Sequence, residues 1–325
     1  GLATYFREHL RKEMKRWIKE NPKNDDDDFY NLYKDGLKIY VTIDSRMQEY
    51  AEDAMKKHMK NLQNELDSQN KKNKTAPFRG LTQKEIDVEL TKAMTRSERY
   101  RVYTKELGKS KKEALASFNI KKNMRVFSWD GEIDTIMTPK DSMLYYKKFL
   151  RTGVLSIEPQ TGNIKAWVGG INHKYFKYDH AKQGTRQVGS TFKPFVYATA
   201  IDQLKFSPCD TLPDAYFCIP EGRHGNLKDW CPKNSNGKYK GMISLKSALA
   251  NSVNTISARL MDKVGPKNVV NIAHSLGVKS EIPEFPSICL GTPELSLYEM
   301  VNSYSTLANM GQYIKPNIIS RIEDK

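Results

Sequence analysis

The feature that most constrains this chain is a serine placed three residues before a lysine, at the start of an apolar segment. Ser190 follows Gly189, and a nearly continuous apolar run extends from Lys193 to Leu204. If Ser190 opens a helix, its side chain and that of Lys193 share one face, with Cβ atoms about 5–6 Å apart. A hydroxyl and an amine in this arrangement can act as nucleophile and proton acceptor. The apolar run predicts a buried helix, which tolerates Pro194 because that residue falls in the first turn.

The spacing Ser-x-x-Lys is weak by itself, because it occurs three times, beginning at Ser68, Ser190 and Ser235. The first and last copies lie in polar stretches, where nothing would fix or desolvate the lysine. Only Ser190 precedes an apolar helix. Other hydrolase chemistries have less support, since no Gly-x-Ser-x-Gly elbow surrounds Ser190, no histidine lies in a recognisable context and no local pair of carboxylates indicates a glycosidase.

A second candidate motif is the pair Ser252 and Asn254, on a short break between two predicted helices. Residues at i and i+2 do not share a helix face. Both side chains can therefore reach one site only from a non-helical turn. The alternative is that the pair only caps the helix beginning at Thr255. Beside Ser190 and Lys193, we favour the site.

Length and composition limit the class of protein. The chain has 325 residues, of which 38% are apolar and 28% charged, and its formal net charge is +15. These values describe a globular protein with a polar surface and room for two or more domains. The positive net charge is compatible with binding to an anionic polymer or membrane. No motif indicates binding to nucleic acid, and the short basic runs are typical of solvated helix faces. No run reaches the ~20 apolar residues of a membrane span.

The cysteines leave several alternatives open. Four cysteines allow three pairings, and a disulfide that closes a loop is expected if the compartment is oxidising. Cys218, His224 and Cys231 could instead hold zinc, but their spacing matches no known finger, so we predict no metal site. The four are Cys209, Cys218, Cys231 and Cys289.

Periodicity predicts a mixture of helices and strands, and hence an α+β fold. An amphipathic helix at 2–18 could lie on a membrane surface or, as we favour, pack on a neighbouring domain. The acidic run at 25–28 predicts a solvated connector, because it lacks the alternation and glycine of a calcium loop. The helix from 45 to about 66 should bury one face, which carries Met47, Ala51, Ala54, Met55, His58 and Leu62. The other predicted elements are strands at 37–43, 124–129, 132–137 and 318–322, a hairpin of 154–157 with 164–168, and helices near 83–95, 109–118, 141–150 (capped by Asp141), 244–249, 255–264, 267–276 and 297–310.

The residues from Gly189 to Tyr197 resemble the first active-site motif of class A, bifunctional penicillin-binding proteins, and Ser252-Val253-Asn254 resembles their second. The similarity extends along nearly the whole chain. The insert at 67–150 is similar to that of enzymes from Bacteroidetes-like bacteria. Further similar segments are 1–11 (tail of the glycosyltransferase domain), 42–44 (linker strand), 153–170 (strand pair that opens the transpeptidase domain) and 291–311 (approach to the third motif).

The resemblance implies a D,D-transpeptidase that cross-links peptidoglycan stem peptides through an acyl-enzyme on Ser190. A neutral Lys193 would accept the serine proton, Ser252 would relay it to the leaving amine, and Asn254 would hydrogen-bond the substrate. β-Lactam antibiotics would acylate Ser190. The resemblance also implies partner proteins of cell-wall synthesis, a periplasmic location with a membrane anchor outside this sequence, and no cofactor.

One departure from the family is the third motif, Lys-Thr/Ser-Gly, which these 325 residues lack. We therefore expect an excised piece: a connector at 1–30, a linker domain at 31–152 and the first part of a transpeptidase domain at 153–325. Such a piece should acylate slowly or not at all. The alternatives are a serine β-lactamase-like hydrolase and a non-catalytic scaffold that binds the cell wall.

Overall fold

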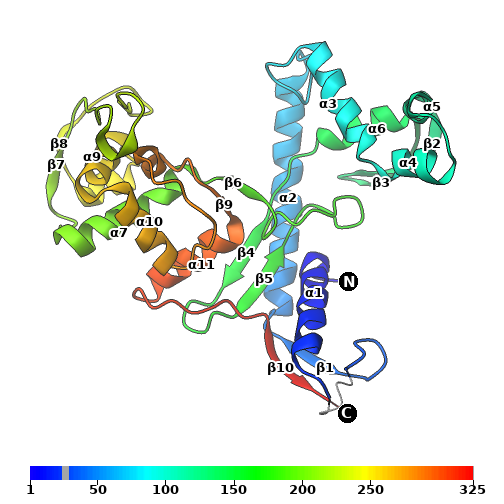
Figure 1. The fold of residues 1–325 in the computed structure, drawn as a ribbon, viewed down its shortest axis with the longest axis horizontal. Helices are drawn as coiled ribbons and strands as arrows, with labels where there is room; N and C mark the ends of the chain where they lie inside the picture. The colour runs from blue at the N-terminus through cyan, green and yellow to red at the C-terminus, as the bar shows by residue number, and fades with distance from the viewer. Residues whose placement is uncertain (24–28, 325) are drawn as a thin grey trace. The chain divides into compact units, whose positions relative to one another are not determined.

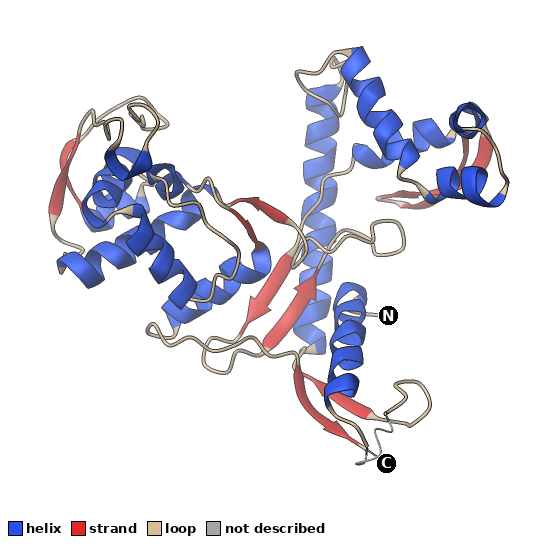
Figure 2. Ribbon diagram, viewed as in Figure 1, coloured by secondary structure: helices blue, strands red, loops and turns tan. Residues whose placement is uncertain are grey.

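The computed structural model describes residues 1–23 and 29–324, and the acidic run predicted as a connector lies outside them. The chain divides into two compact units, shown in Figures 1 and 2. The first unit comprises residues 1–49, 153–169 and 178–325, and the second comprises 50–152 and 170–177. Both units combine helices with antiparallel strand pairs, which confirms the α+β prediction.

The first unit is built around α7, the buried helix that the sequence predicts. Phe195, Val196 and Ala200 on this helix are completely buried, and α9 packs along it. The helical segments of this unit are α1 (Thr4–Glu20), η3 (Gly189–Phe192), α7 (Lys193–Leu204), η4 (Arg223–Gly225), α8 (Leu245–Ala250), α9 (Asn254–Val264), α10 (Pro266–Ser275), η5 (Pro286–Leu290) and α11 (Leu297–Ala308), where η3, η4 and η5 are 3-10 turns.

Four antiparallel strand pairs complete the first unit, and each has two strands. The predicted hairpin is confirmed as β4 with β5. The short pair β6 with β9 was not predicted, because its residues show no alternating apolar pattern. The pairs are β1 (Lys38–Val41) with β10 (Ile319–Glu323), β4 (Val154–Ile157) with β5 (Ile164–Val168), β6 (Thr185–Gln187) with β9 (Glu294–Ser296), and β7 (Thr211–Asp214) with β8 (Gly241–Ser244).

The apolar face of α1 packs inside the first unit. Phe6 and Met14 are 2% and 1% exposed. The Phe6 ring meets the Trp167 ring of β5 edge to face, with centroids 6.2 Å apart. Of the two alternatives for this helix, packing on protein is therefore the one observed. No helix among the described residues combines the length and apolar character needed to cross a membrane.

The second unit follows the predicted order closely. Its α3 matches the predicted bounds because Thr82 and Glu85 form a capping box at its start. The elements are α3 (Gln83–Thr95), α4 (Glu98–Arg101), the π-helical turn η1 (Val102–Glu106), α5 (Lys111–Ala116), the 3-10 turn η2 (Ser117–Asn119), β2 (Lys122–Ser128) paired with β3 (Gly131–Met137), and α6 (Pro139–Lys147).

The helix α2 (Ser45–Asn70) begins in the first unit and continues into the second. The predicted buried face is right only in part, because Met55 is 6% exposed whereas Met47 and Leu62 are 42% and 38% exposed. Gln48 and Gln63 are buried instead. Gln48 exchanges hydrogen bonds with the backbone of Trp167 at 2.7 and 3.0 Å, so the need to pair buried backbone groups decides which face turns inward.

The predicted cap of α6 is also wrong. Thr138 is the N-cap residue, and its hydroxyl accepts a hydrogen bond from the Asp141 N–H. Asp141 occupies the third helical position, and its carboxylate accepts a hydrogen bond from the Thr138 N–H, as in a capping box. The helix begins at Pro139, which is favoured in a first turn.

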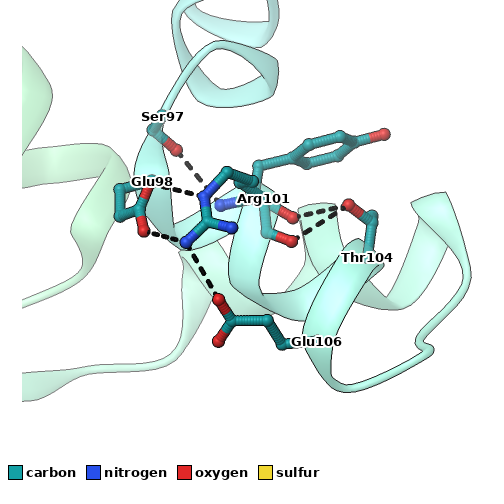
Figure 3. A network of polar contacts seen from close by, with 6 residues as sticks. Ser97, Glu98, Arg101, Thr104 and Glu106 are labelled. Atoms are coloured by element: carbon teal, nitrogen blue, oxygen red, sulfur yellow. Dashed lines mark hydrogen bonds and ion pairs between the residues drawn. The ribbon is translucent and has the colours of Figure 1, made fainter.

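The segment α4–η1 was not predicted, and Figure 3 shows the contacts that hold it. Ser97 caps α4 by accepting a hydrogen bond from the Tyr100 N–H. The Arg101 guanidinium lies between the carboxylates of Glu98 and Glu106 and binds Glu106 at 2.9 Å. Charged side chains rather than an apolar stripe hold this turn, so hydrophobic periodicity could not reveal it.

Candidate active site

Ser190 lies in the 3-10 turn η3, directly before α7. In a 3-10 turn, side chains three residues apart eclipse one another, so the turn aligns Ser190 with Lys193. The Gly189 N–H donates to Gly291 O at 2.9 Å, which ties the turn to η5. Ser190 is exposed, and its hydroxyl makes no hydrogen bond with the described part of the chain. A first-turn position also leaves the Ser190 N–H without a partner inside the helix, available to a developing oxyanion.

Lys193 is 1% exposed, although it carries a charged group. Its ammonium nitrogen lies 2.6 Å from Ser252 O, 2.9 Å from Ser252 Oγ and 2.7 Å from Asn254 Oδ1. The three acceptors match the three N–H donors of an ammonium group. The lysine therefore links the first predicted motif to the second.

The second motif lies on a non-helical turn, as the sequence predicts. α8 ends at Ala250 and α9 begins at Asn254, and Ser252 between them has a φ of 54°. This left-handed conformation lets the side chains of Ser252 and Asn254 reach the same lysine nitrogen. The alternative that the pair caps α9 is not observed, since no cap hydrogen bond comes from the N-cap residue Val253.

Burial lowers the pKa of Lys193 from its usual 10.5 to about 8. The cost of holding the charged form is therefore about 3 kcal/mol. The buried thiol of Cys289 lies nearby, and burial raises its pKa, so the thiol is neutral and leaves the amine without a fixed counter-ion. At pH 7 roughly a tenth of Lys193 is neutral. That fraction is sufficient for a lysine to act as a general base.

Asn234 and Asp214 support the second motif, and the sequence analysis missed both. Asn234 Oδ1 accepts hydrogen bonds from the N–H groups of Asn254 at 3.0 Å and Thr255 at 3.3 Å. These two N–H groups open α9 and have no acceptor within the helix. Asn234 Nδ2 donates to Asp214 Oδ1 at 2.8 Å, and Thr255 Oγ1 donates to the same oxygen at 2.6 Å. A polar loop-rich segment gives no local signal of such contacts.

A disulfide closes the loop that ends three residues before Asn234. Cys218 and Cys231 are bonded, which selects one of the pairings that the sequence left open. Cys209 is free and exposed, and Cys289 is free and buried. The zinc alternative is not observed, because His224 contacts Asp262 instead, at 3.2 Å. Residues 1–23 and 29–324 contain no group of three side chains that could hold a metal ion.

These features define a class of site. The site has an exposed serine hydroxyl one turn before a buried lysine, and this lysine has a lowered pKa and contacts a Ser-x-Asn turn. Such an arrangement is typical of serine acyl-transfer enzymes of the Ser-x-x-Lys type. The family model described as the penicillin-binding protein transpeptidase domain matches residues 152–325, and that of the penicillin-binding protein middle domain matches residues 73–150. The chain belongs to the penicillin-binding protein transpeptidase family.

Individual relatives agree with this assignment. The chain is 29% identical over 309 residues to penicillin-binding protein 1A of Aquifex aeolicus, covering 90% of this chain and 40% of the relative. The corresponding protein of Neisseria flavescens is 28% identical over 316 residues, covering 90% and 39%. The chain thus spans about two fifths of the length of these relatives. The crystal structure of penicillin-binding protein 1A from Haemophilus influenzae shares the fold, with a TM-score of 0.64 at 22% identity over 99% of this chain and 48% of that one.

Proposed function

We propose that this chain carries the acyl-transfer site of a peptidoglycan D,D-transpeptidase. The observation that supports it most directly is the buried Lys193, which joins the Ser190 turn to Ser252 and Asn254. The domains at 31–152 and 153–325 are proposed as linker and transpeptidase domains. As the resemblance to bifunctional penicillin-binding proteins implies, the chain would act within a bifunctional enzyme of cell-wall synthesis at the periplasmic face of the membrane.

In the first half-reaction, Ser190 Oγ attacks the carbonyl carbon between the two terminal D-alanines of a stem peptide. Its proton passes to neutral Lys193, and the Ser190 N–H stabilises the oxyanion. Ser252, in contact with Lys193, relays that proton to the leaving D-alanine amine as the peptide bond breaks. The product is an ester between Ser190 and the donor peptide.

In the second half-reaction, an amine of a neighbouring strand attacks this ester. Lys193 and Ser252 take up the amine proton and return it to Ser190 Oγ as the ester breaks, so the enzyme is regenerated. Asn254 Nδ2 donates to Lys233 O at 2.9 Å, which leaves its second N–H for the substrate peptide. β-Lactams, which resemble the D-Ala-D-Ala end, would acylate Ser190 by the same first step.

Covalent labelling of the full gene product with a fluorescent penicillin tests this function. Ser190→Ala should abolish labelling without lowering the melting temperature, because the exposed hydroxyl makes no hydrogen bond with the described chain. Ser68→Ala is the matched control, since Ser68 begins another Ser-x-x-Lys spacing and should leave labelling unchanged. Labelling that persists in Ser190→Ala contradicts the proposal, and rapid turnover of nitrocefin would identify a hydrolase instead.

A further inference from the structure

The first unit contains a polar pocket that includes none of the four proposed catalytic residues. It has a volume of about 480 Å³. Its walls come from the start of α11, the end of β9, the loop that follows α10 and the segment that precedes β10. The proposed acyl-transfer chemistry makes no use of this pocket.

Three lysines line the pocket: Lys182, Lys279 and Lys315. None of them lies within 4.0 Å of a carboxylate oxygen in the described part of the chain. Lys182 contacts His9 Nε2 at 3.1 Å. Burial and the neighbouring Lys182 lower the pKa of His9 to about 4, so this histidine is neutral and adds no charge beside the lysine.

One carboxylate, that of Glu299, also borders the pocket, and its hydrogen bonds are made within the chain. It accepts from Ser280 N–H at 2.7 Å and from Ser296 Oγ at 2.7 Å, among five such contacts. Burial acts to raise the pKa of Glu299, but these hydrogen bonds outweigh it and leave the pKa below its usual value. Glu299 is therefore ionised, and three lysines less one carboxylate leave a formal charge of about +2 on the side chains that line the pocket.

A buried amide without a partner also lines this pocket. Asn302 is 3% exposed, and its side chain makes no hydrogen bond to any residue within 1–23 and 29–324. The pocket thus offers an unused amide donor beside three cations, and the hydroxyl-bearing Thr185 also lines it.

We propose that this pocket binds a phosphate-type oxyanion that carries about two negative charges. The charge matches the surplus of about +2 around the pocket. Phosphate is favoured over carboxylate because the pocket is lined by lysines and no arginine. Lysine binds phosphate as a point charge. A planar carboxylate is instead bound best by arginine, whose guanidinium can donate two parallel hydrogen bonds to it. The ligand is either a free phosphate monoester or the headgroup of a phosphomonoester lipid.

Calorimetric titration of the full gene product with inorganic phosphate and with glycerol phosphate tests the proposal, and vesicles of phosphatidic acid in phosphatidylcholine test the lipid source. The double variant Lys279→Met/Lys315→Met should weaken binding by at least about tenfold. Asn302→Asp, which keeps the size of the side chain and adds negative charge, should weaken it as strongly. Lys263→Met/Lys267→Met removes two exposed lysines outside the pocket and should change nothing.

If the wild type binds inorganic phosphate or glycerol phosphate and the pocket variants do not, the ligand is a free phosphate. Binding to vesicles alone, lost in the same variants, supports the site and identifies a lipid headgroup. Three results would overturn the proposal: no binding of either the soluble probes or the vesicles, an equal loss of binding in the control variant, or binding of malonate as tight as that of phosphate. Ser190→Ala should bind phosphate normally, so this outcome is independent of the acyl-transfer function.

Discussion

Asn234 holds Asn254 in place through a hydrogen bond of 3.0 Å from the Asn254 N–H to the Asn234 side-chain oxygen. The two residues belong to different segments, and Asn254 in turn contacts the buried Lys193 at 2.7 Å. A residue outside the recognised motifs therefore positions one of them.

The first prediction concerns this contact. Asn234→Ala leaves the N–H groups of Asn254 and Thr255 without their acceptor, so the free energy of unfolding should fall by about 1–3 kcal/mol. Acylation by a fluorescent penicillin should slow by roughly tenfold, because the second motif loses its support. Asn236→Ala, in an exposed turn two residues further on, is the control. A loss of stability with an unchanged acylation rate would show that Asn234 is structural only.

The second prediction is the dependence of acylation on pH. Because Lys193 must be neutral to accept the serine proton and its pKa is about 8, the rate should rise with pH and level off above pH 9. Lys193→Met should lower the rate at least about a hundredfold and remove this dependence. A rate in the wild type that does not change between pH 6 and pH 9, roughly the range over which the amine titrates, would contradict the assignment.

The same lysine predicts how stability depends on pH. Its pKa is 10.5 in the unfolded chain and about 8 in the folded one, so the unfolded chain binds more protons between these values. The wild type should therefore gain about 3 kcal/mol relative to Lys193→Met as the pH rises through that window. Urea unfolding of both proteins at the two ends of the window measures the difference. A difference that stays constant would show that burial does not disfavour the charged amine.

The third prediction concerns Gly291, which packs on the turn η3 that carries Ser190. A Cβ atom there would lie 1.7 Å from Gly189 O, and Gly291 has a φ of +80°. Gly291→Ala should therefore cost more than about 3 kcal/mol, because backbone on both sides must move. Gly237→Ala, with a φ of +66° and nothing within 4 Å, should cost only about 1–2 kcal/mol. Equal losses in urea unfolding would exclude the close approach as the cause.

The fourth prediction concerns the disulfide. Cys218 and Cys231 close a loop of sequence separation 13, and Asn234 follows three residues after it. Cys218→Ser/Cys231→Ser should lower the free energy of unfolding by about 2–4 kcal/mol and slow acylation. Cys209→Ser, which removes an exposed free thiol, should affect neither. An unchanged acylation rate in the double variant would mean that the loop holds Asn234 without the bond.

Local patterns predicted much of the fold and named the residues of the proposed site. The buried helix α7, the hairpin β4–β5 and the break at Ser252 depend on residues adjacent in sequence, so periodicity reveals them. The inward face of α2 was predicted only in part, because Gln48 is buried where it pairs with the backbone of Trp167, 119 residues away. Pattern rules treat glutamine as a surface residue and cannot anticipate that pairing.

The sequence by itself determined which residues are capable of the chemistry. Ser190, Lys193, Ser252 and Asn254 were all named from spacing, context and family resemblance. Only the tertiary structure decided that Lys193 contacts both Ser252 and Asn254, that burial lowers its pKa to about 8, and that Asn234 supports the second motif. These properties depend on distances between segments far apart in the chain and on exclusion of water, which exist only after folding.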